Sequence, residues 1–167
     1  MAGTQASIKT WDEHYRSPWK RGTGAQRKHL KLVFDADIHK DGTSWKIARL
    51  MPVNNYSDIK IRTDGLPNVT IDLGCVGHER DCKGKPVNED LTYFANALDV
   101  GSKLCGDLDC GPWDCRGSCK PECCDDDLTD DCPPAPTHIA EPHDIVLTIH
   151  GDVEDCAVLN LTFEYTN

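Results

Sequence analysis

The chain has 167 residues, a formal net charge of −10 and 38% hydrophobic residues. This length fits one domain, or one domain with a small appended module, and it is sufficient to bury a hydrophobic core. The acidic balance argues against a nucleic-acid binder, and no apolar run approaches the roughly 18 residues that a membrane-spanning helix needs.

Residues 1–28 are predicted to form an extended arm that is basic and aromatic. The first 31 residues carry seven Lys and Arg against two carboxylates, a balance of +5. Trp11, Tyr15 and Trp19 are spaced by four residues, but a proline between the last two disfavours one continuous helix. We expect these aromatic side chains to pack on the domain itself or on a partner.

From residue 29 onward, apolar and polar residues alternate with the period of two that half-buried β-strands produce. The alternation covers residues 30–38, 45–53, 59–62 and 69–75, with turn signals at Lys40–Thr43 and Asp64–Asn68. The first two of these strands are separated by a short connection that contains the turn signal Lys40–Thr43, so we expect them to form a hairpin.

Residues 88–100 are predicted to form a short helix. Leu91, Phe94, Ala95 and Leu98 have the i, i+3, i+4, i+7 spacing of an apolar helix face. Asn88 is a suitable N-terminal cap, and the glycine at position 101 is a suitable stop.

The last 24 residues show the clearest alternation and predict a terminal hairpin. Ile145, Leu147 and Ile149 share one face of the first strand, and a turn at Gly151–Asp155 leads to the second. The pattern as a whole is typical of a mainly all-β protein, an antiparallel β-sandwich of jelly-roll-like type. We expect this domain to span residues 29–167, with an irregular Cys-rich insertion at 105–132 before the terminal hairpin.

The ten cysteines favour a disulfide framework, because their number is even and no C-x-x-C pair is present. The missing pair argues against a zinc ribbon, a dithiol oxidoreductase and an iron–sulfur site. The candidates are Cys75, Cys82, Cys105, Cys110, Cys115, Cys119, Cys123, Cys124, Cys132 and Cys156.

Seven of these cysteines lie in residues 105–132, so at least one must pair outside this insertion, and Cys156 is a candidate partner. Cys75 and Cys82 are predicted either to form a disulfide or, with His78, to contribute to a zinc site. A metallothionein-like thiolate cluster remains the alternative for the insertion.

The Cys-rich insertion is also acidic, with nine carboxylates against two basic residues, a balance of −7. Its carboxylates are candidates for a calcium site held by disulfides, although no complete calcium-loop motif is present. A solvated acidic surface is the simpler interpretation. The candidate calcium ligands are Asp107, Asp109, Asp125, Asp126, Asp127, Asp130 and Asp131.

Three N-x-S/T motifs predict glycosylation at Asn55, Asn68 and Asn160, and with the cysteines they indicate an extracellular or cell-surface protein. The first ten residues lack the apolar stretch of a secretory leader, so such a protein would have lost its leader. A cytoplasmic location is the alternative.

The sequence contains no recognised catalytic motif, and we assign no catalytic residue. We predict a non-catalytic structural or binding module that binds a protein partner or copies of itself through its basic arm and acidic insertion. Trp11, Tyr15, Trp19 and Trp113 are the candidate partner-binding residues, with a glycan as a further ligand. The alternatives are a cytosolic thiolate metal-binding protein and a carbohydrate-binding or carbohydrate-active β-sandwich. The sequence establishes no cofactor; of the two candidate ions, calcium ranks ahead of zinc.

Overall fold

The computed structural model describes residues 8–50, 55–87, 89–107 and 142–166. In this part of the chain it contains nine β-strands, arranged in two sheets, and one short α-helix, α1 (Asp12–Tyr15). Sheet A has five strands in the order β1 (Ile8–Thr10), β3 (Ser44–Leu50), β8 (His143–His150), β5 (Thr70–Gly77) and β6 (Glu89–Asp99). Sheet B has four strands in the order β2 (Ala25–Val33), β9 (Val158–Thr166), β4 (Asn55–Thr63) and β7 (Leu104–Asp107).

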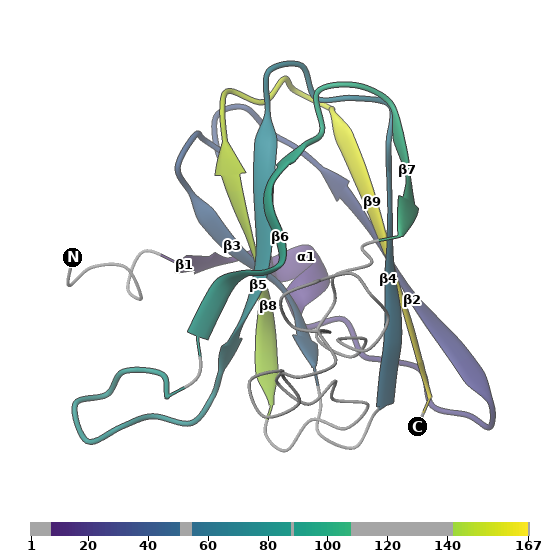
Figure 1. Ribbon diagram of the computed structural model, residues 1–167, viewed down its shortest axis with the longest axis vertical. Coiled ribbons are helices and arrows are strands. Elements are labelled where there is room, and N and C mark those ends of the chain that lie inside the picture. Colours follow the sequence, from purple (N-terminus) through teal and green to yellow (C-terminus); the bar gives the residue numbers. More distant parts are fainter. Residues whose placement is uncertain (1–7, 51–54, 88, 108–141, 167) are drawn as a thin grey trace, which may run out of the picture.

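The two sheets pack face to face, with sheet A on the left and sheet B on the right of Figure 1. The chain passes repeatedly from one sheet to the other, so that neighbours within a sheet come from distant parts of the sequence. Strands β2 to β9 have the order of an eight-stranded jelly roll, and β1 adds to β3 in parallel. The predicted mainly β sandwich of jelly-roll-like type is confirmed.

The core lies between the sheets and consists of the alternate apolar residues that the sequence pattern identified. Sheet A contributes Ile47, Ile71, Leu73, Ile145, Leu147 and Ile149, and sheet B contributes Leu30, Leu32, Ile59, Ile61, Leu159, Leu161 and Phe163. Because these strands have one face on the core, the period-two pattern identified the core-facing residues of β2, β3, β4, β5, β8 and β9, whereas β1, β6 and β7 were not predicted as strands.

The two predicted hairpins are wrong, although the strands themselves are in place. Strand β2 lies in sheet B and β3 in sheet A, and likewise β8 lies in sheet A and β9 in sheet B. The loops 34–43 and 151–157 therefore carry the chain from one sheet to the other. Alternation reports which residues face the core, but it contains no information on which strand is the hydrogen-bonded neighbour.

Strand β2 begins and ends five residues earlier than the predicted 30–38: it includes residues 25–28, which were predicted to belong to the extended arm, and it ends at Val33 because the chain turns at Asp35. The side chain of Asp35 accepts a hydrogen bond from the backbone N–H of Asp37 (2.8 Å), and its carbonyl accepts one from the N–H of His39 (2.8 Å). As a result Ile38 is half exposed and His39 is buried, the reverse of the expected orientation.

The predicted helix at 88–100 is also wrong, because these residues form strand β6. The pairing of β6 with β5 shifts twice, so that β6 has extra residues relative to its partner: Leu73 pairs with Ala95, but Cys75 pairs with Asp90. These irregularities break the period of two and give the apolar residues of β6 a spacing of three and four, which resembles a helix.

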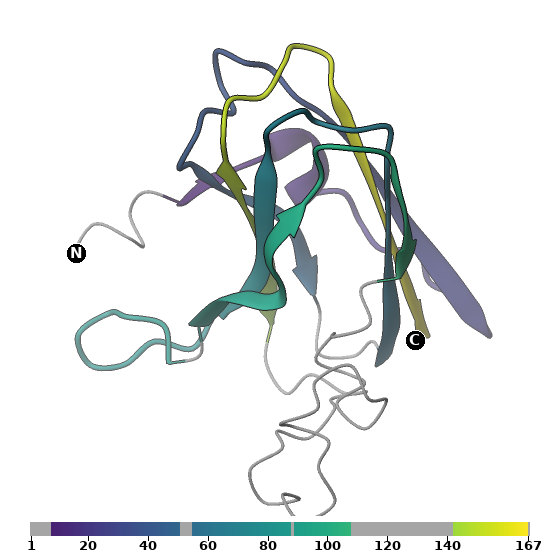
Figure 2. The ribbon, with the colours of Figure 1, turned by 45° about the horizontal axis from the view of Figure 1, so that its top comes forward.

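The connection between β5 and β6 projects from the sandwich, as Figures 1 and 2 both show. Its residues 78–87 are held by their own backbone hydrogen bonds, including Asp81 N–H to Lys85 O (2.8 Å) and Val87 N–H to Glu79 O (2.9 Å). The Asp81 carboxylate also accepts hydrogen bonds from the backbone N–H groups of Lys83 and Lys85, and these bonds lower the pKa of that carboxyl.

Candidate functional site

Trp11 anchors the segment that precedes β2 to the core. Its side chain is 6% exposed and stacks on His39, with ring centroids 3.9 Å apart, while Phe34 and Trp45 meet it edge-on. Its backbone N–H donates to the carbonyl of Lys46 (2.9 Å), which continues the pairing of β1 with β3. Trp11, a predicted partner-binding residue, is therefore part of the chain's own core.

Two histidines flank Trp11, and burial lowers the pKa of both. His39 Nδ1 accepts a hydrogen bond from the backbone N–H of Asp35 (2.9 Å), which requires that nitrogen to be unprotonated. The Nε2 of His14 is buried and has no hydrogen-bond partner in the part of the chain that the structure describes. Both rings therefore belong to the packing around Trp11, and their burial favours the neutral form.

Asp144 on β8 is the centre of a buried polar network, with a side chain only 3% exposed. Its Oδ1 accepts a hydrogen bond from Tyr15 Oη (2.8 Å) and lies 2.9 Å from His78 Nε2. Lys46 Nζ is 3.5 Å from Oδ2, and Arg49 Nε is 3.6 Å from Oδ1. The carboxylate thus joins α1, β3 and the residue after β5 to the outer side of β8.

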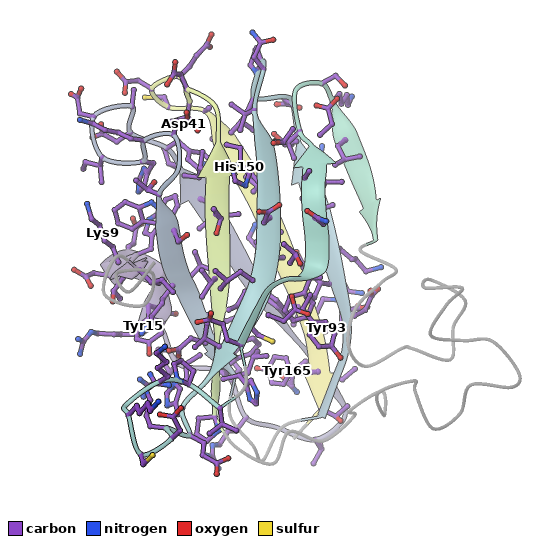
Figure 3. All side chains as sticks on the ribbon, turned by 60° about the vertical axis from the view of Figure 1, so that its left-hand side comes forward. Lys9, Tyr15, Asp41, Tyr93, His150 and Tyr165 are labelled. Carbon is purple, nitrogen blue, oxygen red and sulfur yellow. The ribbon has the colours of Figure 1, made fainter. Side chains whose placement is uncertain are left out.

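Tyr15 is the member of this network that belongs to the predicted aromatic arm; it is the last residue of α1, and Figure 3 shows it on the flank of the sandwich. Burial raises the pKa of its phenol, which keeps the Oη proton available for Asp144. Arg49 donates to Tyr15 Oη (2.6 Å) and lies 5.1 Å from the ring centroid. Tyr15 is therefore engaged within its own chain.

Trp19 and Lys28 hold the segment between α1 and β2. Trp19 Nε1 donates to the carbonyl of Arg49 (2.7 Å), and its ring lies edge-on against Phe163 and Tyr165. Lys28 is buried and donates from Nζ to the carbonyl and the hydroxyl of Ser17. Trp113, the fourth predicted partner-binding residue, lies outside the described residues.

The described cysteines do not form disulfides with one another. Cys82, Cys105 and Cys156 are exposed and carry free thiols, and Cys75 is half-buried and is not bonded to Cys82. The remaining candidates, Cys110, Cys115, Cys119, Cys123, Cys124 and Cys132, lie outside the described residues, so a disulfide framework there stays a prediction.

No group of three His, Cys, Asp or Glu residues suitable for a metal ion occurs in the described part of the chain. His78 is bonded to Asp144, and this positions its ring in the buried network. Of the predicted calcium ligands, Asp107 ends β7 and the other six lie outside the described residues, so the calcium site stays a prediction.

The three predicted glycosylation positions lie in different settings. Asn55 begins β4, Asn68 is exposed in the β4–β5 turn with a φ of 63°, and Asn160 is half-buried in the middle of sheet B. Glycosylation stays a prediction. Within the described residues, no helix has the length and apolar character needed to cross a membrane.

One end of the sandwich is strongly acidic. The loops 34–43 and 151–157 lie together there, joined by hydrogen bonds from Ala36 N–H to Asp155 Oδ1 (2.7 Å) and from Gly151 N–H to Asp41 Oδ1 (2.8 Å). Figure 3 shows Asp41 at this end. The six carboxylates of the two loops, which we call the acidic end, are Asp35, Asp37, Asp41, Asp152, Glu154 and Asp155, and Lys40 is the only Lys or Arg among the same residues.

The outer face of sheet B is basic and polar, and we call it the basic face. Strand register places its side chains in three rows across β2, β9 and β4: Lys31, Asn160 and Arg62; His29, Thr162 and Lys60; and Arg27, Glu164 and Asp58. A shallow cavity of about 480 Å³ lies over the first two rows and is lined by His29, Lys60, Ile61, Arg62, Cys105, Asn160 and Thr162.

The charges of the basic face are only partly balanced. The third row pairs Arg27 with Glu164 (3.0 Å), and Lys60 of the second row lies 3.7 Å from Asp58. Lys31 and Arg62 of the first row are exposed, and their side chains make no ion pair or hydrogen bond with any described residue. Positive charge is therefore available beside the cavity.

No known protein family matches the chain, and no curated protein matches its sequence. Among solved structures, a chain of the capsid of Ralstonia phage GP4 has a similar fold, with a TM-score of 0.53 at 8% identity over 96% of this chain and 97% of that chain. A chain of the Cyanophage Pam1 capsid asymmetric unit has a TM-score of 0.46 at 9% identity, over 92% and 94% of the two chains. At 8% identity, the likeness to the Ralstonia phage GP4 chain concerns the fold alone, a jelly-roll sandwich, and the two chains are of nearly the same length.

The features that sequence reasoning missed are the network around Asp144, the buried Lys28 and the basic face. Asp144 looks like an ordinary outward-facing strand residue, and its partners lie far away in the sequence. Lys28 falls at the end of the predicted arm, where a lysine gives no sign of burial. The alternation of Arg27, His29 and Lys31 along one strand was a usable signal for the basic face.

Proposed function

We propose that the chain is a non-catalytic structural subunit that associates with copies of itself in a capsid-like shell. The observation that carries this proposal is the fold likeness to a chain of the Ralstonia phage GP4 capsid, which extends over nearly the whole of both chains. The likeness therefore concerns the jelly-roll sandwich as a whole and not one part of it.

The surface of the sandwich supports the same proposal. The aromatic residues of the segment before β2 pack on their own domain, and this leaves the charged surfaces for contacts with other molecules. The acidic end and the basic face are of opposite charge, both are built on the rigid sandwich, and both are exposed. Jelly-roll sandwiches are a recurrent architecture of viral capsid domains.

The net charge of −10 suggests the position of the subunit in such a shell. An acidic protein is repelled by the phosphate backbone of packaged nucleic acid. We therefore place the subunit on the side of the shell that faces away from nucleic acid, in contact with other protein subunits.

The experiment that tests this function is the mass of the purified protein as a function of concentration. We expect multi-angle light scattering to show a reversible rise in mass from about 1 µM to about 100 µM, the range over which micromolar contacts are populated. Electron microscopy of the concentrated protein should show particles of uniform curvature or size. A monomer at every concentration would contradict the proposal.

A further inference from the structure

We propose that copies of this chain associate by a heterologous contact, in which the acidic end of one copy docks on the basic face of the next. This inference rests on the proposed self-association and specifies its two surfaces. Each copy then offers one acidic end and one basic face, so the contact is between unlike surfaces.

The basic face has the features of a receptor for carboxylates. Lys31, Asn160 and Arg62 are direct cross-strand neighbours, which places adjacent β-carbons about 5 Å apart. The amide of Asn160 lies between two cations that have no partner of their own among the described residues. The adjoining cavity leaves space for side chains that enter from another molecule.

The acidic end has the features of the matching ligand. Three of its carboxylates hold the loops in place: Asp35, Asp41 and Asp155 each accept a hydrogen bond from a backbone N–H group. The other three, Asp37, Asp152 and Glu154, are exposed, and their side chains make no bond to any described residue. The fold therefore presents three unused carboxylates on a fixed frame.

Within one copy, no ion pair joins the two surfaces among the described residues. The first row of the basic face adjoins the acidic end, because β2 leads into loop 34–43 and β9 follows loop 151–157, but its side chains lie on the outer face of sheet B. Contact between unlike surfaces leaves one open acidic end and one open basic face after every addition. Such heterologous contacts close into a ring or extend as an open filament, and a ring is a unit from which a capsid-like shell is built through further contacts.

The test uses two full-length variants with reversed charge. The face variant carries Lys31→Glu and Arg62→Glu, and the end variant carries Asp37→Lys, Asp152→Lys and Glu154→Lys. We expect each variant alone to lose at least about tenfold in association constant by light scattering, because its two surfaces then repel. An equimolar mixture should recover association, since each reversed surface meets its opposite in the other variant.

A control variant, Lys83→Glu with Lys85→Glu, makes the same charge change as the face variant on the projecting β5–β6 loop and should associate like the wild type. Raising NaCl from 50 mM to 500 mM should weaken wild-type association. Circular dichroism melting curves verify that every variant is folded. If a multiple variant does not fold, the single variants Arg62→Glu and Glu154→Lys are used instead, each alone and as an equimolar mixture.

The outcomes separate this inference from the proposed function. If the wild type associates and both variants associate equally well, the heterologous contact is wrong and self-association stands. If only the face variant loses association, the acidic end is not the surface that the basic face binds. The basic face would then bind other carboxylates, such as those within residues 109–131. A wild type that is monomeric at every concentration and salt overturns both proposals.

Discussion

Asp144 shows how one residue can attach a terminal segment to a β-sandwich. Its carboxylate is nearly inaccessible to solvent, and Tyr15, His78, Lys46 and Arg49 surround it from three parts of the chain. Removing water from a charge is costly, and the surrounding donors and cations offset that cost. The loss of the charge would leave these groups without their common partner.

The first prediction is that Asp144→Asn lowers the free energy of unfolding by about 3 kcal/mol, because a buried ion-pair network loses its only anion. Urea denaturation of the full chain measures this change. The control is Asp58→Asn, whose ion pair with Lys60 is more exposed and should change stability by less than about 1 kcal/mol. Equal effects of the two substitutions would contradict the structural role of Asp144.

We expect His39, which packs on Trp11, to make the free energy of unfolding depend on pH. Burial holds its pKa below the ordinary value of 6.5, although the nearby Asp35 carboxylate acts in the opposite direction. As the pH falls below this value, the unfolded chain takes up the proton before the folded chain does, so the free energy of unfolding decreases. Stability from this residue is fully present above pH 6.5 and is lost on acidification.

We therefore expect His39→Phe, which retains an aromatic ring beside Trp11, to show a smaller loss of stability between about pH 7 and pH 5 than the wild type. Thermal unfolding across this pH range provides the measurement. His14 has a pKa shift in the same direction, so the double variant with His14→Phe should show a still smaller slope. An unchanged slope in the double variant would exclude both histidines as its source.

At the scale of elements, strand β6 depends on close contact with β5. Gly74 lies where the start of β6 crosses β5, and a β-carbon at this position would overlap the backbone of Asp90 and Leu91. The irregular pairing on either side of Leu73 accommodates this approach. A glycine in a strand often indicates such a close backbone contact, and here it fixes the path of the neighbouring strand.

We expect Gly74→Ala to lower the free energy of unfolding by about 3 kcal/mol, because the backbone of β6 must move away from β5. The matched control is Gly84→Ala in the projecting β5–β6 loop, where a β-carbon would meet nothing and only the positive φ of 81° is unfavourable. That substitution should cost about 1 kcal/mol. Chemical denaturation measures the loss of unfolding free energy in both variants. A larger loss for Gly74→Ala than for Gly84→Ala indicates overlap with β6, because backbone strain alone acts at Gly84.

A comparison of strands β9 and β6 shows why the sequence predicted part of the fold and missed the rest. Leu159, Leu161 and Phe163 of β9 pair regularly on both sides, so their alternation reports the core directly. Leu91, Phe94 and Leu98 of β6 follow an irregular ladder and take a helix-like spacing. The candidate site was harder still, because the basic face consists of residues from strands that become neighbours only through the jelly-roll order.

At the scale of the whole molecule, positive and negative charges gather on different surfaces, although the net charge is −10. A protein with a charge of −10 carries a face on which Lys31 and Arg62 are unpaired with any described residue. Negative charge gathers at the loops between strands, and positive charge lies on the flank of one sheet. In the proposed self-association, this distribution favours contact between unlike surfaces over repulsion in every orientation.

We predict that the protein does not bind double-stranded DNA at physiological salt, because its overall negative charge outweighs the attraction of phosphates to one small basic face. An electrophoretic mobility shift assay at about 150 mM NaCl tests this expectation. A shift that Lys31→Glu with Arg62→Glu abolishes would instead assign the basic face to nucleic acid.

The central place of β9 in sheet B has a consequence for the timing of assembly. This strand lies between β2 and β4, so sheet B is divided until the last described strand has been synthesised. The loop before β9 supplies half of the acidic end, and β9 itself supplies the middle of the basic face. A nascent chain on the ribosome therefore lacks a complete sheet B and a complete basic face until β9 has been translated. In the proposed self-association, synthesis order alone would delay contact between copies until the sandwich has formed.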